Sequence, residues 1–190
     1  MRLNLGCGFN HLDGFVNVDK EPACAPDRIV DLEEFPWPFA ESSVDEVVAS
    51  HILEHLGADT ETYLAIIKEL YRICVPGALI RIAVPHPRSD DFLIDPTHVR
   101  PILPDQMHLF SKAKNREWAE QGFANTPLAL YLDVDFELDS VEWMPTELWR
   151  ERLQAGEISA DDLAEKALHQ YNILQEIQMV LRVIKDGAEE

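Results

Sequence analysis

Short apolar runs, each closed by glycine, proline or a polar residue, recur along the first half of the chain. Leu3 and Leu5 begin the series, and Gly6-Cys7-Gly8 follows them directly. Similar runs lie at 15–20, 28–31, 43–50 and 78–84. Runs of this kind are typical of strands buried on both faces, as in a parallel sheet.

The segment 59–74 has a helical period. Its apolar positions repeat every three to four residues, at Tyr63, Ile66, Ile67, Leu70, Tyr71 and Cys74. Thr60 is the expected cap, and Pro76-Gly77 is expected to stop the helix. This is the one long helix that the first half of the sequence predicts.

The last third of the chain alternates instead. The apolar series Leu130, Leu132, Val134, Phe136 and Leu138 predicts a half-exposed strand, which we expect to continue through Val141 and Trp143. Residues 176–184 alternate as well, although a helix would also bring Ile177, Leu181 and Ile184 together. Two alternating strands after a parallel series predict an antiparallel hairpin at the sheet edge.

Between these elements a helix is expected at about 105–121, and an acidic helical insert at about 145–171 with Gly156 inside it. Proline-dotted loops are expected around 33–43 and 88–106. The whole pattern predicts a single α/β domain over 1–190. We expect a Rossmann-like three-layer sandwich with a mainly parallel seven-stranded sheet and an antiparallel C-terminal edge hairpin.

The first crossover is unusually short. Asp19 follows Gly8 by only 11 positions. A connection between parallel strands usually needs a dozen or more residues, most often with a helix. We therefore expect a turn or two of helix at most, or a loop around Asp13-Gly14.

Charge limits the partners. The chain has 35 acidic against 16 basic residues and a net charge of −19, which repels nucleic acids and anionic membranes and leaves a small-molecule substrate as the expectation.

Three unpatterned cysteines (Cys7, Cys24 and Cys74) suit a reducing compartment. With no apolar run of membrane-spanning length and no signal-like leader, a cytoplasmic protein is expected. Trp143, Met144 and Trp149 are expected in the core or on the surface of a homodimer.

Acids close two of the predicted strands, Asp19 the second and Asp31 the third. A glycine turn at the carboxyl end of a first strand is where open α/β sheets bind nucleotide-like cofactors. A carboxylate after the next strand can accept from both hydroxyls of a ribose. The third glycine of the dinucleotide-binding pattern is absent, so this signal depends on the rest of the chain.

In this order the motifs resemble the class I S-adenosylmethionine-dependent methyltransferases. The likeness is greatest to a small bacterial group of predicted methyltransferases that begins at LNLGCG. The matching stretches are LNLGCG (3–8), GFVNVDK (14–20), DLEEFPWPF (31–39), SVDEVVASHILEHL (43–56), ELYRICVPGALIRIAVPH (69–86) and DPTHVRP (95–101). They cover most of residues 1–110, and the second half matches more loosely.

The resemblance implies transfer of a methyl group from S-adenosylmethionine to a small-molecule or sugar acceptor, leaving S-adenosylhomocysteine. Gly6 and Gly8 would receive the cofactor's amino-acid end, Asp19 its ribose and Asp31 its adenine amine, while Ser50 and His51 would line the methionine arm. The implied cofactor-binding residues are Leu5, Gly6, Cys7, Gly8, Asp19, Lys20, Asp31, Leu32, Ser50 and His51. A protein that binds the cofactor without turnover is an alternative.

A second hypothesis comes from His51-Ile52-Leu53-Glu54-His55, which matches the H-x-x-E-H pattern of the inverzincins. On a helix, His51 and His55 would lie one turn apart and could bind zinc, with Glu54 as general base of a zinc-dependent hydrolase. No strong third-ligand motif follows. The motif also succeeds a valine-rich strand, where the methyltransferase resemblance already accounts for it. We therefore assign no metal from the sequence.

The substrate side is expected at the polar, proline-bounded stretch 95–100, which is long enough to fold over the crevice. Asp95, His98 and Arg100 are its candidate substrate-side residues. His55, His86 and His98 are candidate general bases for a hydroxyl acceptor, because histidine titrates near neutral pH. Methyl transfer also depends on positioning an already activated methyl group, which needs no base.

Overall fold

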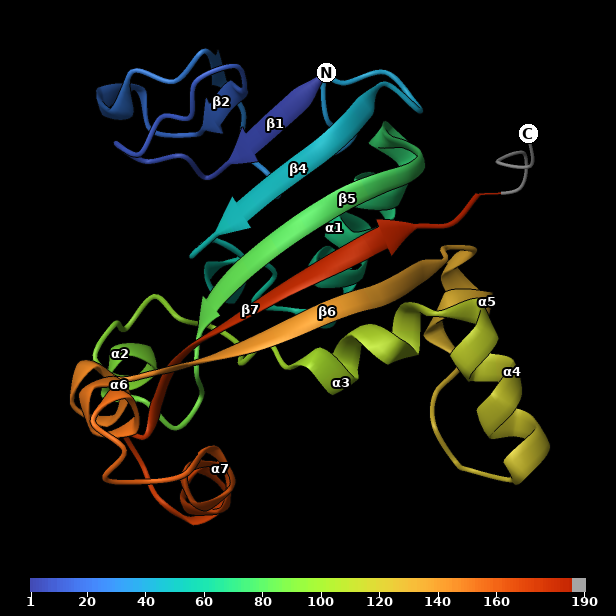
Figure 1. Ribbon diagram of the computed structural model, residues 1–190. Coiled ribbons are helices and arrows are strands. Elements are labelled where there is room, and N and C mark those ends of the chain that lie inside the picture. Colours follow the sequence, from blue (N-terminus) through green and yellow to red (C-terminus); the bar gives the residue numbers. More distant parts are fainter. Residues whose placement is uncertain (186–190) are drawn as a thin grey trace.

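The computed structural model describes residues 1–185 and contains a seven-stranded sheet in the order β3-β2-β1-β4-β5-β7-β6 (Figure 1). The parallel strands are β1 (Arg2–Leu5), β2 (Val16–Asp19), β3 (Arg28–Ile29), β4 (Val44–Ser50) and β5 (Cys74–Pro85). The antiparallel strand β7 (Leu174–Val183) lies between β5 and β6 (Phe136–Pro145). The predicted α/β class, the mainly parallel sheet and the antiparallel edge hairpin are confirmed.

The carboxyl ends of β1, β2 and β4 meet along one edge of the sheet. Leu5 is level with Val18 of β2 and with Ala49 of β4. All three side chains are buried, so apolar packing determines this register. The residues that follow these strands therefore lie side by side.

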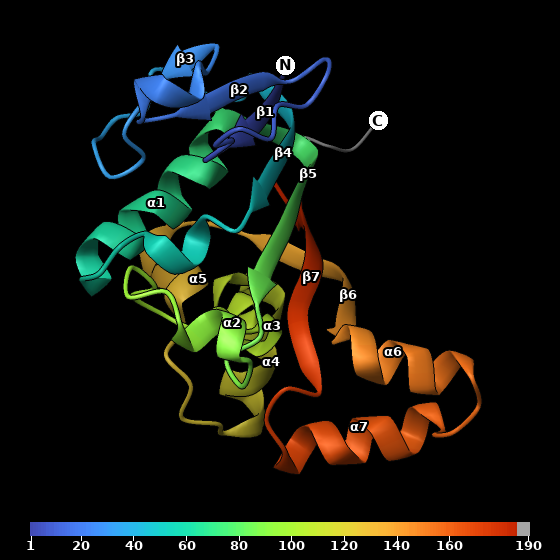
Figure 2. The ribbon, with the colours of Figure 1, turned by 90° about the vertical axis from the view of Figure 1, so that its left-hand side faces the viewer.

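The crossovers between β1 and β4 contain no α-helix. Residues 6–15 form a loop, as their short length predicts, and only the 3-10 helix η1 (Pro22–Cys24) lies between β2 and β3. The sheet face that such helices would cover stays open, and on it exposed Arg81 pairs with Glu46 at 2.8 Å. The described residues thus form a sheet with one helical layer, without the second layer of the expected three-layer sandwich (Figure 2).

Helix α1 (Thr60–Ile73) covers the other face with its buried stripe. Its cap is Asp59 rather than the expected Thr60, because the Asp59 carboxylate accepts from the Thr62 N–H at 2.9 Å. The helix ends at Ile73 and β5 begins at the next residue. Pro76-Gly77 does not stop the helix but lies inside β5, within the irregular stretch 75–78 where the pairing with β4 changes register.

The helix predicted at about 105–121 is divided into α3 (Pro104–Met107), the 3-10 helix η3 (His108–Phe110) and α4 (Lys112–Gln121). Ser111 causes the last break, because its backbone is extended and its hydroxyl caps the Lys114 N–H. These segments join the helical layer, where Phe110 contacts Tyr63 of α1.

The prediction of a strand at 130–138 is wrong for the first half of this range. Leu128–Leu132 form the short helix α5, which ends where Asp133 takes a φ of +53°, and β6 begins only at Phe136. Leu128 and Leu132 pack against the core at helical spacing, whereas Leu130 is exposed. The alternating leucines therefore belong to a short helix and not to a strand. β6 does extend through Val141 and Trp143, as expected.

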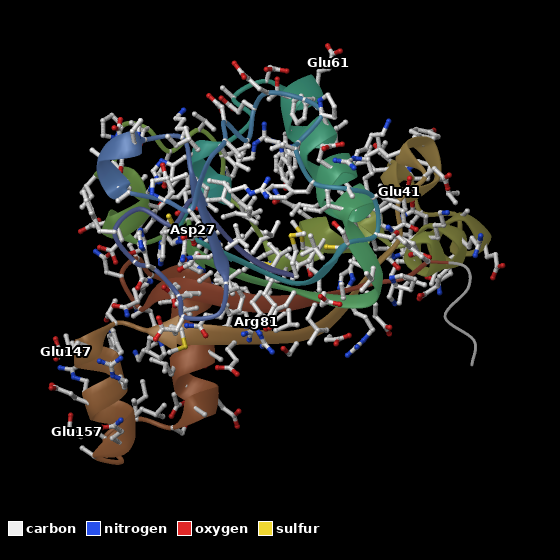
Figure 3. The ribbon with its side chains drawn as sticks, turned by 90° about the horizontal axis from the view of Figure 1, so that it is seen from above. Asp27, Glu41, Glu61, Arg81, Glu147 and Glu157 are labelled. Atoms are coloured by element: carbon white, nitrogen blue, oxygen red, sulfur yellow. The ribbon has the colours of Figure 1, made fainter. Side chains whose placement is uncertain are left out.

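Two helices, α6 (Glu147–Gln154) and α7 (Ala160–His169), lie within the range of the expected acidic insert. With the short α2 (Asp90–Leu93), they lie at the end of the sheet where β5 ends and β7 begins (Figures 1 and 2). Figure 3 shows acidic side chains such as Glu61, Glu147 and Glu157 at the outside of the molecule. None of the helices within residues 1–185 combines the length and the apolar character needed to cross a membrane.

Candidate functional site

The turn after β1 depends on its two glycines. Gly6 has a φ of +62° and Gly8 one of +49°, both in the left-handed region that favours glycine. A Cβ on Gly6 would lie 2.4 Å from Cγ1 of Ile52, because the chain after β4 packs directly on the turn. A Cβ on Gly8 would meet no atom within 4 Å, so a ligand can approach the backbone there.

Asp19 joins this turn to the end of β2. Its Oδ2 accepts from the Gly8 N–H at 2.8 Å, and its Oδ1 accepts from the Glu21 N–H at 2.9 Å. Each carboxylate oxygen has a further lone pair, so both can still accept from a ligand hydroxyl. The structure therefore brings Asp19 and the glycine turn together, and Asp19 also stabilises the local backbone.

Lys20, Asp31 and Leu32 lie further along the same edge. Lys20 Nζ is 3.9 Å from Asp31 Oδ2, and Asp31 Oδ1 accepts from the Glu33 N–H at 2.9 Å. Leu32 is buried beneath this turn. Asp31 thus keeps one oxygen free of backbone contacts, and Lys20 is its exposed neighbour.

β4 ends at Ser50, and His51 follows it with a φ of +52°. The Nδ1 of His51 lies 3.4 Å from Glu54 Oε1, and its Nε2 lies 2.7 Å from Glu176 Oε2. The contact with Glu54, opposed by burial and supported by Glu176, raises the pKa of His51 to about 9. An imidazolium cation therefore lies between two carboxylates directly after β4.

A cavity of about 690 Å³ opens beside His51, and residues from distant parts of the chain line it, including Glu54, His55, Asp95, His98 and Glu176. The rings of His55 and His98 meet edge to face with centroids 4.6 Å apart. Two of the three candidate bases and two of the three substrate-side candidates thus come together.

His86 and Arg100 lie elsewhere. His86 lines a separate apolar cavity of about 620 Å³, where its ring lies 5.9 Å from that of Trp143. The Arg100 guanidinium lies 4.0 Å from the centre of the Tyr63 ring and donates to the Gly57 carbonyl. Arg100 therefore holds its own loop in place, and His86 is not brought to the other two histidines.

The helix on which the H-x-x-E-H interpretation depends is not formed. Only Leu53–His55 make a single 3-10 turn, η2, and His51 precedes it with its two ring nitrogens directed to Glu54 and Glu176. Glu176 was not a candidate from the sequence. It lies 125 positions from His51, and the alternation of β7 does not distinguish it from other exposed polar positions.

Comparison with protein-family models and with curated proteins gives no match. Solved structures do match. A SAM-dependent methyltransferase from Archaeoglobus fulgidus has a TM-score of 0.62 at 19% identity, over 95% of this chain and 85% of that chain. A SAM-dependent methyltransferase from Methanosarcina mazei has a TM-score of 0.56 at 13% identity, over 97% and 92%. The cyclase SpnF has a TM-score of 0.54 at 14% identity, over 96% and 74%.

At these identities the likeness establishes the fold. The presence of a cyclase among the neighbours illustrates that one fold can carry more than one chemistry. The narrower resemblance to the bacterial group that begins at LNLGCG stays a prediction. The chain has the class I methyltransferase fold.

Proposed function

We propose that this protein is an S-adenosylmethionine-dependent methyltransferase. The proposal depends above all on the 2.8 Å hydrogen bond between Gly8 and Asp19, which joins the glycine turn to the acid after β2 at the carboxyl edge of the sheet. Nucleotide-like cofactors bind at this place in open α/β sheets. The fold shared with solved methyltransferases supports the same conclusion.

The residues present suit this cofactor. The open side of Gly8 would admit the amino-acid end, Asp19 would accept from the ribose hydroxyls, and Asp31 from the adenine amine. Ser50 and His51, which follow β4 beside the turn, would line the methionine arm. When bound, S-adenosylmethionine supplies an activated methyl group.

The charge of the cavity disfavours an anionic acceptor. Four carboxylates line it, those of Glu54, Asp91, Asp95 and Glu176, whereas His51 is its cationic neighbour. This excess of negative charge attracts a cationic sulfonium and repels anionic acceptors. A small neutral molecule, such as one with a sugar hydroxyl, agrees with this charge and with the resemblance.

In the proposed reaction the acceptor's lone pair takes the methyl group, the carbon–sulfur bond breaks, and S-adenosylhomocysteine leaves. The acceptor's proton passes to a base or to water. Positioning of the acceptor and exclusion of water supply much of the rate of such a transfer. Of the three candidate bases, His55 and His98 line this cavity, and His86 lines the other one.

Titration calorimetry with S-adenosylhomocysteine tests the proposal. Asp19→Ala should weaken binding by about 2–3 kcal/mol, because a charged acceptor is lost from the ribose hydroxyls. Asp13→Ala, at an exposed loop position of the same region, should bind like the wild type. Thermal unfolding of each variant separates lost contacts from a disturbed turn. Equal affinities would refute the assignment of Asp19, and a folded wild type that does not bind would refute the proposed function.

A further inference from the structure

We propose that Glu54, His55 and His98 bind a divalent transition-metal ion in the cavity beside His51. One donor atom from each residue lies within 4.8 Å of the other two. The sequence pattern paired His51 with His55, but the structure replaces His51 by His98, which comes from the 95–100 loop. This site goes beyond the proposed function and does not depend on the cofactor.

Glu54 gives the first independent observation. Its side chain is 1% exposed, and neither carboxylate oxygen accepts a hydrogen bond from the described residues. Among residues 1–185, its charged contact is the ion pair with His51 at 3.4 Å. A buried carboxylate is costly unless it is paired, hydrogen-bonded or bound to a metal. A metal ion would supply the contacts that these two oxygens lack.

The hydrogen bonding of His98 leaves one ring nitrogen with a free lone pair. Its Nδ1 lies 2.8 Å from the carbonyl oxygen of Phe92. A carbonyl oxygen can only accept, so Nδ1 carries the hydrogen and Nε2 carries the lone pair. Asp95 Oδ2 lies 4.0 Å from this Nε2, which is too far for a hydrogen bond. The Nε2 of His98 is therefore available to a metal.

His55 is oriented by a chain of hydrogen bonds that runs through Thr97 to Asp95. Its Nδ1 lies 2.8 Å from Thr97 Oγ1, and that hydroxyl donates its hydrogen to Asp95 Oδ1 at 2.6 Å. His55 Nδ1 must then be the donor, which leaves the lone pair on Nε2. Histidines that bind metals usually donate their second ring N–H to a neighbouring acceptor, and both histidines here do so.

The backbone holds the three residues together. The Val99 N–H donates to the Glu54 carbonyl at 2.8 Å, which fixes the loop that carries His98 to the turn that carries Glu54 and His55. Phe92 stacks on His98 with ring centroids 5.2 Å apart. Ligands about 2.1 Å from a tetrahedral ion lie roughly 3.4 Å from one another. Binding would therefore need movements of only about an ångström.

The donor set indicates the class of ion. Two imidazoles and one carboxylate suit zinc, iron and cobalt, whereas magnesium prefers oxygen ligands. Three protein ligands also leave coordination positions open, as in catalytic metal sites. In this arrangement His55 and His98 hold the ion, so neither acts as the general base.

Metal titration of chelator-treated, full-length protein tests the proposal. We expect one Zn²⁺ per chain by competition calorimetry, a matching Co²⁺ absorption band, and much weaker binding of Mg²⁺. Glu54→Gln, His55→Ala and His98→Ala should each weaken Zn²⁺ binding by about 100-fold or more, and Thr97→Val by about 10- to 100-fold. His108→Ala, a histidine of η3 away from the cavity, is the matched control and should bind like the wild type.

His51→Ala separates the two possible ligand sets. It should retain Zn²⁺ binding here, whereas the H-x-x-E-H pattern requires its loss. Circular dichroism shows which variants fold, and the isosteric Glu54→Gln decides the result if a histidine variant does not. Wild-type protein without stoichiometric zinc, or Glu54→Gln with wild-type affinity, would overturn the proposal. S-adenosylhomocysteine titrated into the same samples keeps the two proposals separate, because either ligand can bind while the other fails.

Discussion

The two halves of the sheet are stabilised in different ways. β4, β5, β6 and β7 are 7 to 12 residues long and pack beneath a helical layer. β1, β2 and β3 have four residues or fewer, and no α-helix connects them. A polar network supports this half in addition to the buried side chains of Leu3, Leu5 and Val18. Buried Asn17 accepts from Asn4 Nδ2 at 3.0 Å and from the Leu12 N–H at 2.8 Å, and it donates to Asp27 at 2.9 Å. Side-chain hydrogen bonds thus hold the crossovers that are too short for helices.

The same contrast separates the two parts of the site. Most of the proposed cofactor residues lie at or after the ends of the short strands β1, β2 and β3, with contacts such as Gly8 to Asp19, only 11 positions apart, whereas Ser50 and His51 lie at the end of β4. The cavity instead collects residues from the end of β4, the 95–100 loop and the start of β7. Its geometry therefore depends on the long strands of the C-terminal half.

The largest effect is expected from truncating the apolar core of that half. Ile80 of β5 is 0% exposed, so Ile80→Ala should lower the free energy of unfolding by about 3–4 kcal/mol through lost burial and a cavity. Ile29→Ala in β3, where the side chain is 62% exposed, should change it by less than about 0.5 kcal/mol. Urea unfolding monitored by circular dichroism measures both. Similar losses in the two variants would contradict the comparison.

A buried ion pair joins the two halves. Glu69 of α1 accepts from the Trp37 N–H at 2.7 Å and from Arg72 Nε at 2.7 Å. Arg72 in turn donates to the Phe39 carbonyl at 2.9 Å. Glu69→Gln should lower the free energy of unfolding by about 2–3 kcal/mol at neutral pH, since Arg72 loses its charged partner. Glu61→Gln, on the exposed side of the same helix, is the control.

The pH dependence of the Glu69 contribution has a definite sign. Burial raises the pKa of Glu69, but the bonds from Arg72 and the Trp37 N–H outweigh it and hold that pKa below its ordinary value of 4.5. The stabilisation is therefore present above the ordinary value and lost as the pH falls through the lower folded pKa. The difference in unfolding free energy between the wild type and Glu69→Gln should therefore become smaller at acidic pH. A difference that becomes larger at acidic pH would refute this account.

The polar network of the N-terminal half gives a smaller, separate test. Asn17→Ala removes the acceptor of the Leu12 N–H and one of the two acceptors of the Asn4 amide, which keeps its bond to the Asn10 carbonyl, so we expect a loss of about 2 kcal/mol in the free energy of unfolding. Asn10→Ala, at an exposed position in the same crossover, should have little effect. If urea unfolding gives equal values for the two variants, hydrogen bonds from Asn17 do not replace helix packing there.

Features with a local cause were predictable from the sequence. The glycine turn, the acid of Asp19 and the missing first helix follow from residue types and spacing within the first 20 residues. The alternation at 176–184 correctly predicted a strand, because β7 is covered by helices on one face only. The alternation of Leu130 and Leu132 misled, because so short a run also fits one helical turn and only core packing decides between them.

The cavity could not be predicted, because its parts meet only through tertiary structure. The H-x-x-E-H pattern drew attention to His51 and His55, yet η2 is too short to place both on one face. His98 reaches His55 because Val99 bonds the Glu54 carbonyl, and no spacing in the sequence encodes that contact. The open sheet face follows from three crossovers without an α-helix, of which the first two are short and the third, residues 30–43, is long enough for a helix but contains Pro36 and Pro38. The sequence predicted the absence of a long helix only for the first.

The smallest expected effect concerns the cap of α1, the long helix of the helical layer. Asp59 accepts from the Thr62 N–H at 2.9 Å and from the Thr62 hydroxyl at 2.7 Å. Asp59→Ala should cost about 1 kcal/mol of unfolding free energy, and Asp13→Ala, which caps no helix, should cost close to nothing. Because the bonds of Asp59 are confined to the first turn of α1, Asp59→Ala should also leave the affinity for S-adenosylhomocysteine unchanged. A clear loss of that affinity in a folded Asp59→Ala variant would mean that the first turn of α1 helps to position the cofactor residues.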